Sequence, residues 1–148
     1  MCANIDLVEG QLLVAAGKPI PDDIRRAIPS GHAIEIRLTT EQPNRGFAPS
    51  TGVVQELRWP NASPGRLRIE ASVQPGSKLT ADYDALVAKV ITHAPTRHAA
   101  FLLLDRVLAE SGVVPLSTNA SFLRKILGHE SFRAGQYDVT FVDQLLKK

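Results

Sequence analysis

Hydrophobic positions follow two different periods along this chain, and the change of period predicts helices at both ends with strands between them. The opening carries apolar residues at helical spacing: Ile5, Val8, Leu12, Ala15 and Ala16. Asn4 is placed to cap that helix, and Gly17 suits the position just after it. Because Pro19 and Pro21 prevent continuation, we expect the first helix to lie within residues 5–16.

Alternation of apolar and polar residues replaces the helical period near residue 31. In the first alternating run, His32, Ile34, Ile36 and Leu38 share one face, and Ala33, Glu35 and Arg37 share the other. This pattern is typical of an antiparallel sheet with one packed face and one wetter face.

Three further strands are expected after the first. The second has Val53, Leu57 and Trp59 on one face, and the third has Leu67, Ile69, Ala71 and Val73. A loop from Asn61 to Gly65 joins these two strands. Residues 86–91 are apolar on both faces apart from Lys89, which predicts a covered central strand.

The last third returns to the helical period. Thr96 can cap a helix that ends at Gly112 and carries Ala100, Leu103, Leu104, Val107 and Leu108 on one face. A shorter helix carries Phe122, Leu123, Ile126 and Leu127, and Thr140 with Asp143 has capping-box spacing for a last one. We predict an α+β fold for a single domain, residues 1–148. A small antiparallel sheet of about four strands carries the N-terminal helix and the C-terminal helices packed on it.

Composition narrows the function classes. The net charge of +2 and the absence of a Lys/Arg run argue against nucleic acid as a partner, and no apolar run suggests a membrane segment. Cys2 is the only cysteine, and the four histidines lack ligand spacing, so we expect no metal site. A cytoplasmic protein is the simplest interpretation.

The candidate chemistry begins with charged residues on strands that are otherwise apolar. Glu35 and Arg37 share one strand face, and by pattern alone they predict a solvated pair contributing ~0–1 kcal/mol. Lys89 is a lone cation in an apolar strand. Either it pairs with Asp84 or Glu35, or its ammonium group reaches solvent at an edge.

Several short motifs in one order along the chain resemble a known family. Residues 31–37 match the pattern G-H-A-x-E-x-R in full, and residues 47–52 are similar to F-x-P-S-P-G. Residues 82–90 are similar to Y-Y-D-S-M-I-A-K-L, and residues 118–123 are similar to T-N-x-x-F-L. Together these motifs resemble the C-terminal subdomain of biotin carboxylase, the ATP-dependent module of biotin-dependent carboxylases. The chain departs from the family pattern at Gln42, Thr51 and Asp82.

The resemblance implies an activity and a set of site residues. In the family, ATP and bicarbonate form carboxyphosphate, and biotin on a carrier domain is carboxylated at a ureido nitrogen. The resemblance makes Arg37 the catalytic candidate, because a fixed guanidinium stabilises negative charge on the ureido oxygen. Glu35, Lys89 and Asp84 are supporting candidates. Arg68 and Glu70 lie on a strand that resembles the family's dimer contact.

The same resemblance implies what these 148 residues do not contain. The family's upstream ATP-grasp domains supply the groups that bind ATP and Mg²⁺, and no motif of theirs is found here. We therefore expect a piece of a ligase that is inactive alone and binds no cofactor by itself. The alternative is a stand-alone, non-catalytic interaction module derived from that family. A weaker third hypothesis is an unrelated small-molecule binding domain with a similar fold.

Overall fold

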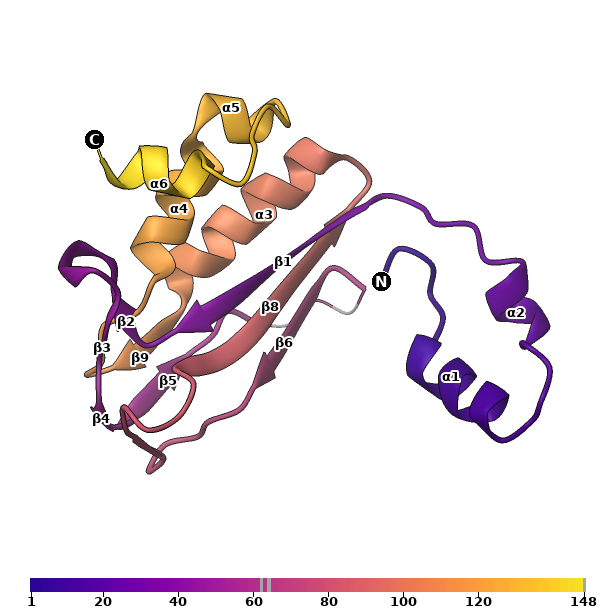
Figure 1. The fold of residues 1–148 in the computed structure, drawn as a ribbon, viewed down its shortest axis with the longest axis horizontal. Coiled ribbons are helices and arrows are strands. Elements are labelled where there is room, and N and C mark those ends of the chain that lie inside the picture. Colours follow the sequence, from indigo (N-terminus) through magenta and orange to yellow (C-terminus); the bar gives the residue numbers. More distant parts are fainter. Residues whose placement is uncertain (62, 64, 148) are drawn as a thin grey trace.

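The centre of the fold is a three-stranded antiparallel sheet in the order β1-β8-β6 (Figure 1). This computed structural model describes residues 1–61, 63 and 65–147. The strands are β1 (His32–Thr39), β8 (Leu86–Ala94) and β6 (Leu67–Ala71). The predicted central position of residues 86–91 is confirmed, and that strand continues to Ala94. The predicted loop from Asn61 to Gly65 includes residues 62 and 64, which lie outside the described residues.

Three two-stranded ribbons surround the end of this sheet. They pair β2 (Glu41–Gln42) with β3 (Ala48–Pro49), β4 (Gly52–Val53) with β7 (Lys78–Leu79), and β5 (Glu56–Arg58) with β9 (Gly112–Val114). A single turn of 3₁₀ helix, Pro43–Arg45, connects β2 to β3. The α+β class is confirmed, but the main sheet has three strands among the described residues rather than about four.

The second predicted strand is interrupted at Val54 and Gln55, which belong to neither β4 nor β5. Val54 is fully buried, whereas Val53 is 50% exposed. Val53 therefore does not share a packed face with Leu57 and Trp59, and that part of the prediction is wrong. The two halves, β4 and β5, pair with different partners.

Two helices cover one face of the sheet, namely α3 (Arg97–Glu110) and α4 (Ala120–Gly128) (Figure 1). The predicted cap of α3 is confirmed, since Thr96 Oγ1 accepts a hydrogen bond from the Ala99 N–H at 3.2 Å. The helix ends at Glu110 rather than at Gly112, which opens β9. The core between these helices and the sheet includes the fully buried side chains of Leu38, Val87, Val90 and Leu104.

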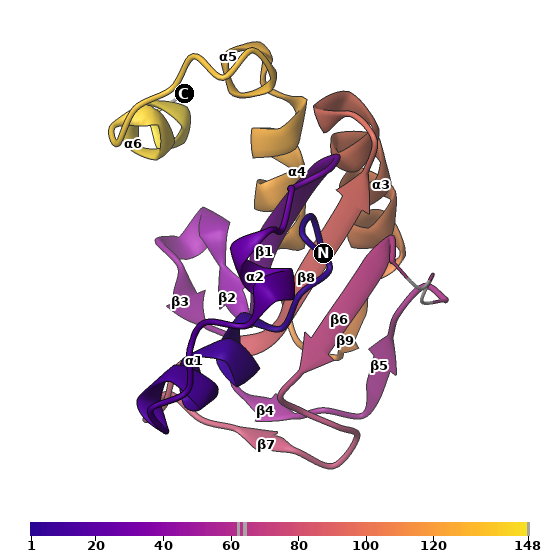
Figure 2. The ribbon, with the colours of Figure 1, turned by 90° about the vertical axis from the view of Figure 1, so that its right-hand side faces the viewer.

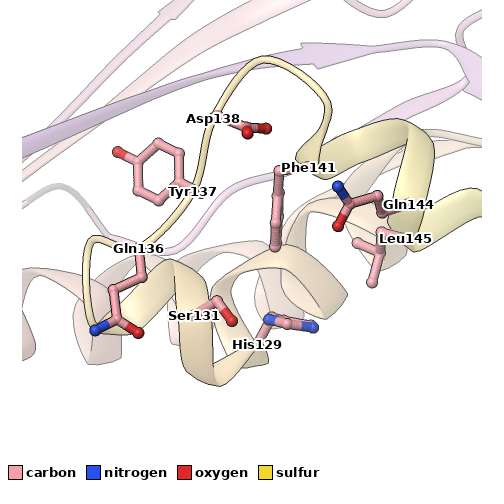
Figure 3. Close-up of a pocket in the computed structure, with 8 residues that line it drawn as sticks. All are labelled: His129, Ser131, Gln136, Tyr137, Asp138, Phe141, Gln144 and Leu145. Carbon is pink, nitrogen blue, oxygen red and sulfur yellow. The ribbon is translucent and has the colours of Figure 1, made fainter.

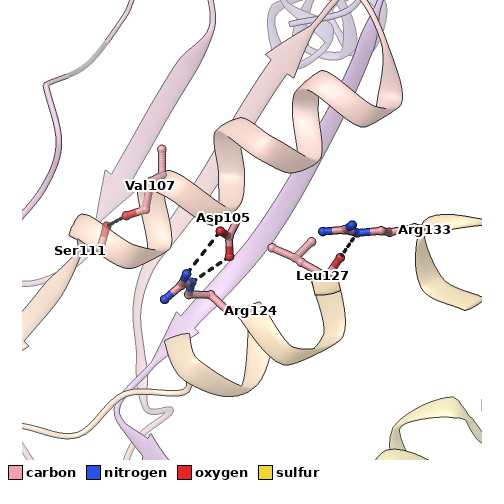
Figure 4. Close-up of polar contacts among 6 residues, drawn as sticks. All are labelled: Asp105, Val107, Ser111, Arg124, Leu127 and Arg133. Carbon is pink, nitrogen blue, oxygen red and sulfur yellow. Dashed lines mark hydrogen bonds and ion pairs between the residues drawn. The ribbon is translucent and has the colours of Figure 1, made fainter. Parts of the chain in front are cut away.

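Polar contacts fix the positions of α3 and α4 relative to each other (Figure 4). The Arg124 guanidinium on α4 donates to both carboxylate oxygens of Asp105 on α3, at 2.8 and 3.3 Å. Beyond α4, the Arg133 Nε donates to the Leu127 carbonyl at 2.9 Å and so joins α5 (Glu130–Arg133) to the end of α4. The two hydrogen bonds between Arg124 and Asp105 orient α4 and α3 more than a single contact would.

The last helix, α6 (Phe141–Leu146), begins without the predicted capping box. Thr140 makes no side-chain cap, and Asp138 organises the turn instead of Asp143. The Asp138 carboxylate accepts hydrogen bonds from the Thr140 hydroxyl at 2.7 Å and from its N–H at 2.8 Å. These bonds favour the charged form and lower the pKa of Asp138.

The N-terminal helices α1 (Leu7–Ala15) and α2 (Asp22–Arg25) lie apart from the sheet, on the side opposite α3 and α4 (Figures 1 and 2). The prediction that the first helix packs on the sheet is therefore wrong in this detail. Asp6, rather than Asn4, caps α1, because its carboxylate accepts from the N–H groups of Val8 and Glu9. Gly17 ends the helix as predicted, at φ +76°.

Candidate functional site

The predicted site residues lie on the open face of the sheet, away from α3 and α4. Arg37 of β1 lies directly opposite Lys89 of β8, and Lys89 lies opposite Glu70 of β6. In the next row, Glu35 lies opposite Ile91, which lies opposite Arg68. Directly opposite residues in antiparallel strands point to the same face. The structure therefore brings five of the six predicted residues onto one surface, in two adjacent rows.

Asn119, next to α4, fixes the local geometry of β1. Its amide Nδ2 donates to the Arg37 carbonyl at 3.1 Å, and its Oδ1 accepts from the Thr39 N–H at 3.1 Å. The Asn119 N–H in turn donates to the Thr39 carbonyl at 3.1 Å. The backbone groups of Arg37 and Thr39 thus point away from β8.

This orientation makes Arg37 and Lys89 a non-hydrogen-bonded pair of the ladder. In such pairs the Cα atoms are only about 4.5 Å apart, and the side chains are closer than in hydrogen-bonded pairs. On the other side of β8, the His93 N–H donates to the carbonyl of Arg66, the residue before β6, at 2.8 Å. Lys89 lies four residues before His93 on the same strand, so its backbone groups also point toward β6 and away from β1, which agrees with this assignment. Two cationic side chains therefore emerge next to each other.

Neither cation is neutralised by a carboxylate. Among the described residues, no acidic oxygen lies within 4.0 Å of the Arg37 guanidinium or of the Lys89 ammonium. Arg68 is different, since it forms an ion pair with Glu70 on its own strand. Like charges directly opposite each other destabilise a sheet, so an anion placed between Arg37 and Lys89 would be bound favourably.

Neither of the carboxylates predicted to accompany these cations contacts them. Glu35 is exposed and forms no ion pair with Arg37 within the described chain. Asp84 precedes β8, and its carboxylate accepts from the Leu86 N–H at 3.2 Å. Three residues of extended strand separate Leu86 from Lys89, or roughly 10 Å. Of the two predicted partners for Lys89, neither is within ion-pair distance.

Arg37 lies on an open surface rather than in a cavity of this chain. It lines none of five described cavities of about 290 to 890 Å³. One of these cavities, with a volume of about 480 Å³, lies between α5 and α6 (Figure 3). The sequence did not predict it. His129 meets the Phe141 ring edge-on there, with ring centroids 5.0 Å apart. Its lining residues all lie within residues 129–145, but their spacing forms no motif of a known site, so no sequence signal predicts it.

The described residues contain neither a candidate metal site nor a candidate membrane-spanning helix. Within residues 1–61, 63 and 65–147, no group of three or more His, Cys, Asp and Glu side chains could hold a metal ion. Within the same ranges, no helix combines the length and the apolarity that a membrane crossing needs.

Comparison with known proteins relates this geometry to a family. The family model described as the biotin carboxylase C-terminal domain matches residues 35–144. The alpha subunit of mitochondrial methylcrotonoyl-CoA carboxylase from Glycine max is 36% identical over 143 residues, which are 97% of this chain and 19% of that protein. The biotin carboxylase of Halalkalibacterium halodurans is 38% identical over 144 residues, 97% of this chain and 31% of that protein.

Solved structures agree with the sequence relatives. The biotin carboxylase domain dimer of Hydrogenobacter thermophilus 2-oxoglutarate carboxylase was solved in complex with MgADP, ADP and bicarbonate. It superposes with a TM-score of 0.88 at 28% identity, over 97% of this chain and 31% of that chain. This chain thus spans less than a third of each of these three proteins. The comparisons favour the first hypothesis over a derived interaction module, and the chain belongs to the biotin carboxylase C-terminal domain family.

Proposed function

We propose that this domain supplies one wall of the biotin-carboxylation site of a biotin-dependent carboxylase, a ligase that uses ATP and bicarbonate. The observation that carries the proposal is the pair of unneutralised cations, Arg37 and Lys89, directly opposite each other on the open face of the sheet. The family's relatives are named as carboxylases, and one was solved with bicarbonate and MgADP. The substrate's negative charge fits a surface with two adjacent positive side chains.

Arg37 is the residue that would contact the biotin ureido group. Its guanidinium stays charged and donates hydrogen bonds in a planar fork, which suits a ureido oxygen on which negative charge develops. Asn119 holds the Arg37 carbonyl, so the strand that carries this guanidinium is fixed before substrate arrives. ATP and Mg²⁺, when bound by the rest of the enzyme, supply the activation of bicarbonate.

Lys89 and the nearby carboxylates would act in support of Arg37. Lys89 adds a second positive charge on the side chain directly opposite, with Cβ atoms about 5 Å apart as in any such pair, and so increases the attraction for an anion. Glu70, opposite Lys89, would limit that charge, although one of its carboxylate oxygens already pairs with Arg68. Glu35 and Asp84 would orient groups that reach the open face from outside this chain.

The partners follow from the same proposal. The upstream ATP-grasp domains complete the site, a biotin carrier domain delivers the substrate, and a second copy of the enzyme pairs through the β6 surface that bears Arg68 and Glu70. The Hydrogenobacter thermophilus relative was solved as a domain dimer, which supports this last point. We place the enzyme in the cytoplasm, while the plant relative is named as mitochondrial.

A chimera tests this function directly. These 148 residues replace the aligned segment of the Halalkalibacterium halodurans biotin carboxylase, and biotin-dependent ATP cleavage is measured. We expect activity in the chimera, and a loss of about 10²- to 10³-fold in kcat for Arg37→Ala, the usual effect of removing one stabilising donor. Arg45→Ala, at another exposed arginine in the 3₁₀ turn, should leave the rate unchanged. An active chimera in which Arg37→Ala matches the parent would refute the role of Arg37.

A further inference from the structure

The ladder between β1 and β8 is irregular directly after Arg37. Its register shifts between Leu38 and Thr39, where β8 carries one residue more than β1. Such a β-bulge interrupts the ladder and increases the local twist, and bulges are common next to active sites, where they direct a side chain. The regular ladder therefore fixes Arg37 from one side only, and the segment after the bulge fixes it from the other.

The segment directly after the bulge is bonded to three distant parts of the chain. Asn119 exchanges backbone and side-chain hydrogen bonds with Thr39. The Thr40 N–H donates to the Ala85 carbonyl at 2.9 Å, and the Thr40 carbonyl accepts from the Ser50 N–H at 2.8 Å. Each of these three partners lies in one of the motifs that resemble the family, so the motifs converge where β1 ends.

The side chain of Thr39 has a charged partner in Glu41. The Thr39 hydroxyl donates to the Glu41 Oε2 at 2.6 Å, and both residues are half-buried. A hydrogen bond of this length to an ionised carboxylate is roughly twice as strong as a neutral one. Because side chains alternate along a strand, Thr39 projects from the same face as Arg37. The contact therefore lies on the side of the strand that carries the candidate catalytic group.

No cation competes with Thr39 for this carboxylate. Among the described residues, Glu41 forms no ion pair, and the Thr39 hydroxyl is the one hydrogen-bond donor that reaches its carboxylate. Glu41 therefore does not pair with Arg37 directly. Its influence on Arg37 passes through Thr39 and the backbone of β1.

We propose that Glu41 is a positioning residue for Arg37. Its carboxylate holds Thr39 beyond the bulge, and Thr39 with Asn119 fixes the direction in which β1 presents the guanidinium. A displacement of about 1 Å at a reacting group can cost about 10²-fold in rate, so a contact that touches no substrate can still control the reaction. The inference rests on the proposed function of Arg37, whereas the bonded end of β1 is a property of this chain alone.

Biotin-dependent ATP cleavage by the chimera tests the proposal through conservative variants. Thr39→Val removes the hydroxyl and keeps the branched shape, whereas Thr39→Ser keeps the hydroxyl. We expect kcat to fall about tenfold in Thr39→Val and in Glu41→Ala and to stay within about twofold in Thr39→Ser. Thr40→Val is the matched control and should leave kcat within about twofold, because the hydroxyl of Thr40 is 3.5 Å from the Ala85 carbonyl, at the limit of a hydrogen bond.

Combination with Arg37→Ala separates positioning from a general structural role. If Thr39 acts through the guanidinium, Thr39→Val has nothing left to misplace once the guanidinium is removed. In the Arg37→Ala background, Thr39→Val should therefore change the residual kcat by less than about twofold, since mutations that act through one shared group are not additive. A variant that only destabilises the fold would lower the rate in both backgrounds.

Amide hydrogen exchange in the 148-residue chain gives a second measurement that needs no activity. The N–H of residue 39 donates to the Asn119 Oδ1 and reports on the end of β1. Its exchange should become about fivefold faster or more in Thr39→Val and in Glu41→Ala, but not in Thr39→Ser. The N–H of Ile36, which faces β8, should keep its protection in all three variants and so show that the sheet is folded.

Three results would overturn the proposal. The exchange at residue 39 could stay unchanged in Thr39→Val, or kcat could stay unchanged although that exchange becomes faster. The loss of rate could also be equal with and without the Arg37 guanidinium, which would make the contact purely structural. A chimera without activity would count against the proposed function, and the exchange at residue 39 would still support or refute the hold of Glu41 on β1.

Discussion

Asn119 is the single polar residue on which the position of β1 depends most. Only 8% of its surface is exposed, and it exchanges three hydrogen bonds with Arg37 and Thr39. Asn119→Ala removes the two side-chain bonds and leaves the Arg37 carbonyl and the Thr39 N–H without partners. We expect the free energy of unfolding to fall by about 2–3 kcal/mol, because unmade buried hydrogen bonds are costly. Urea denaturation of the 148-residue chain measures this change.

Ser121→Ala provides the control for that measurement. Ser121 lies two residues further along, in the first turn of α4, and is exposed. Its replacement should change the free energy of unfolding by no more than about 0.5 kcal/mol. If both variants lower stability equally, the helix terminus in general, rather than the contact with β1, would account for the loss.

Residue patterns predicted burial better than they predicted contacts. Leu38, Val90 and Leu104 were expected to face the core from their spacing, and all three are fully buried. The sequence singles out Asn119 only as part of a motif, because its bond to the Arg37 carbonyl joins positions 82 residues apart. The residue opposite Lys89 on β1 could not be predicted either, because cross-strand register depends on how distant segments pair.

At the scale of elements, α1 depends on its own ends more than on packing. Gly17 has φ +76°, and the N–H groups of Gly17 and Lys18 close the helix by donating to the carbonyls of Val14 and Leu13 at 3.0 Å. A Cβ at Gly17 would meet no atom within 4 Å, so Gly17→Ala costs only backbone strain, about 1 kcal/mol. Amide protection within α1 should fall about fivefold, while the global unfolding midpoint stays unchanged.

Gly128→Ala distinguishes this backbone effect from a general effect of alanine. Gly128 is the last residue of α4, its φ is not positive, and an added Cβ there also meets no atom within 4 Å. This change should leave stability equal or slightly higher, because alanine favours a helix. Unaltered protection of α1 in Gly17→Ala would show that the left-handed turn is not needed.

The turn before α6 should respond to acid. Hydrogen bonds from Thr140 lower the pKa of Asp138 from its ordinary value near 3.8. Because the folded-state pKa is the lower one, the stabilisation is complete above the unfolded value and disappears as the pH falls through the folded value. Amide chemical shifts of residues 138–146, followed from neutral pH downward, should show a local transition below about pH 4. Asp138→Asn should abolish it and Asp143→Asn should not; persistence in Asp138→Asn would assign it to another group.

Periodicity predicted whole elements where one residue type dominated a face, and failed where the chain changes direction. The helix capped by Thr96 and the central strand are both present, because their apolar stripes are long. The second strand divides between Val53 and Glu56, and two adjacent valines give no sign of which is buried. The ribbons that result have only two or three residues per strand, which is too short for alternation to detect.

At the scale of the whole molecule, one face of the sheet is covered by helices and the other is open. One is closed by α3 and α4, and the other bears Arg37 and Lys89. The helices α1 and α2 lie on the side of the sheet away from α3 and α4 (Figure 2). The family relationship and the charged strand of the candidate site could be predicted from linked motifs. The position of β1 at an edge of this sheet could not be predicted, because it depends on the order of the strands, which no local pattern contains.

The exposed apolar surface of α1 makes the last prediction one of assembly. Leu7, Val8 and Leu12 are 62%, 64% and 67% exposed, and together they form a patch on one short helix. Such patches drive association unless a partner covers them, so we expect the 148-residue chain to self-associate with rising concentration in sedimentation velocity. The double change Val8→Gln with Leu12→Gln should restore a monomer and leave the global unfolding midpoint unchanged, because neither side chain reaches the core. Leu102→Gln, at a single apolar residue 54% exposed on α3, is the control and should leave association as it was. A chain that stays monomeric at high concentration, or that Leu102→Gln disperses equally well, would mean that α1 needs no covering surface.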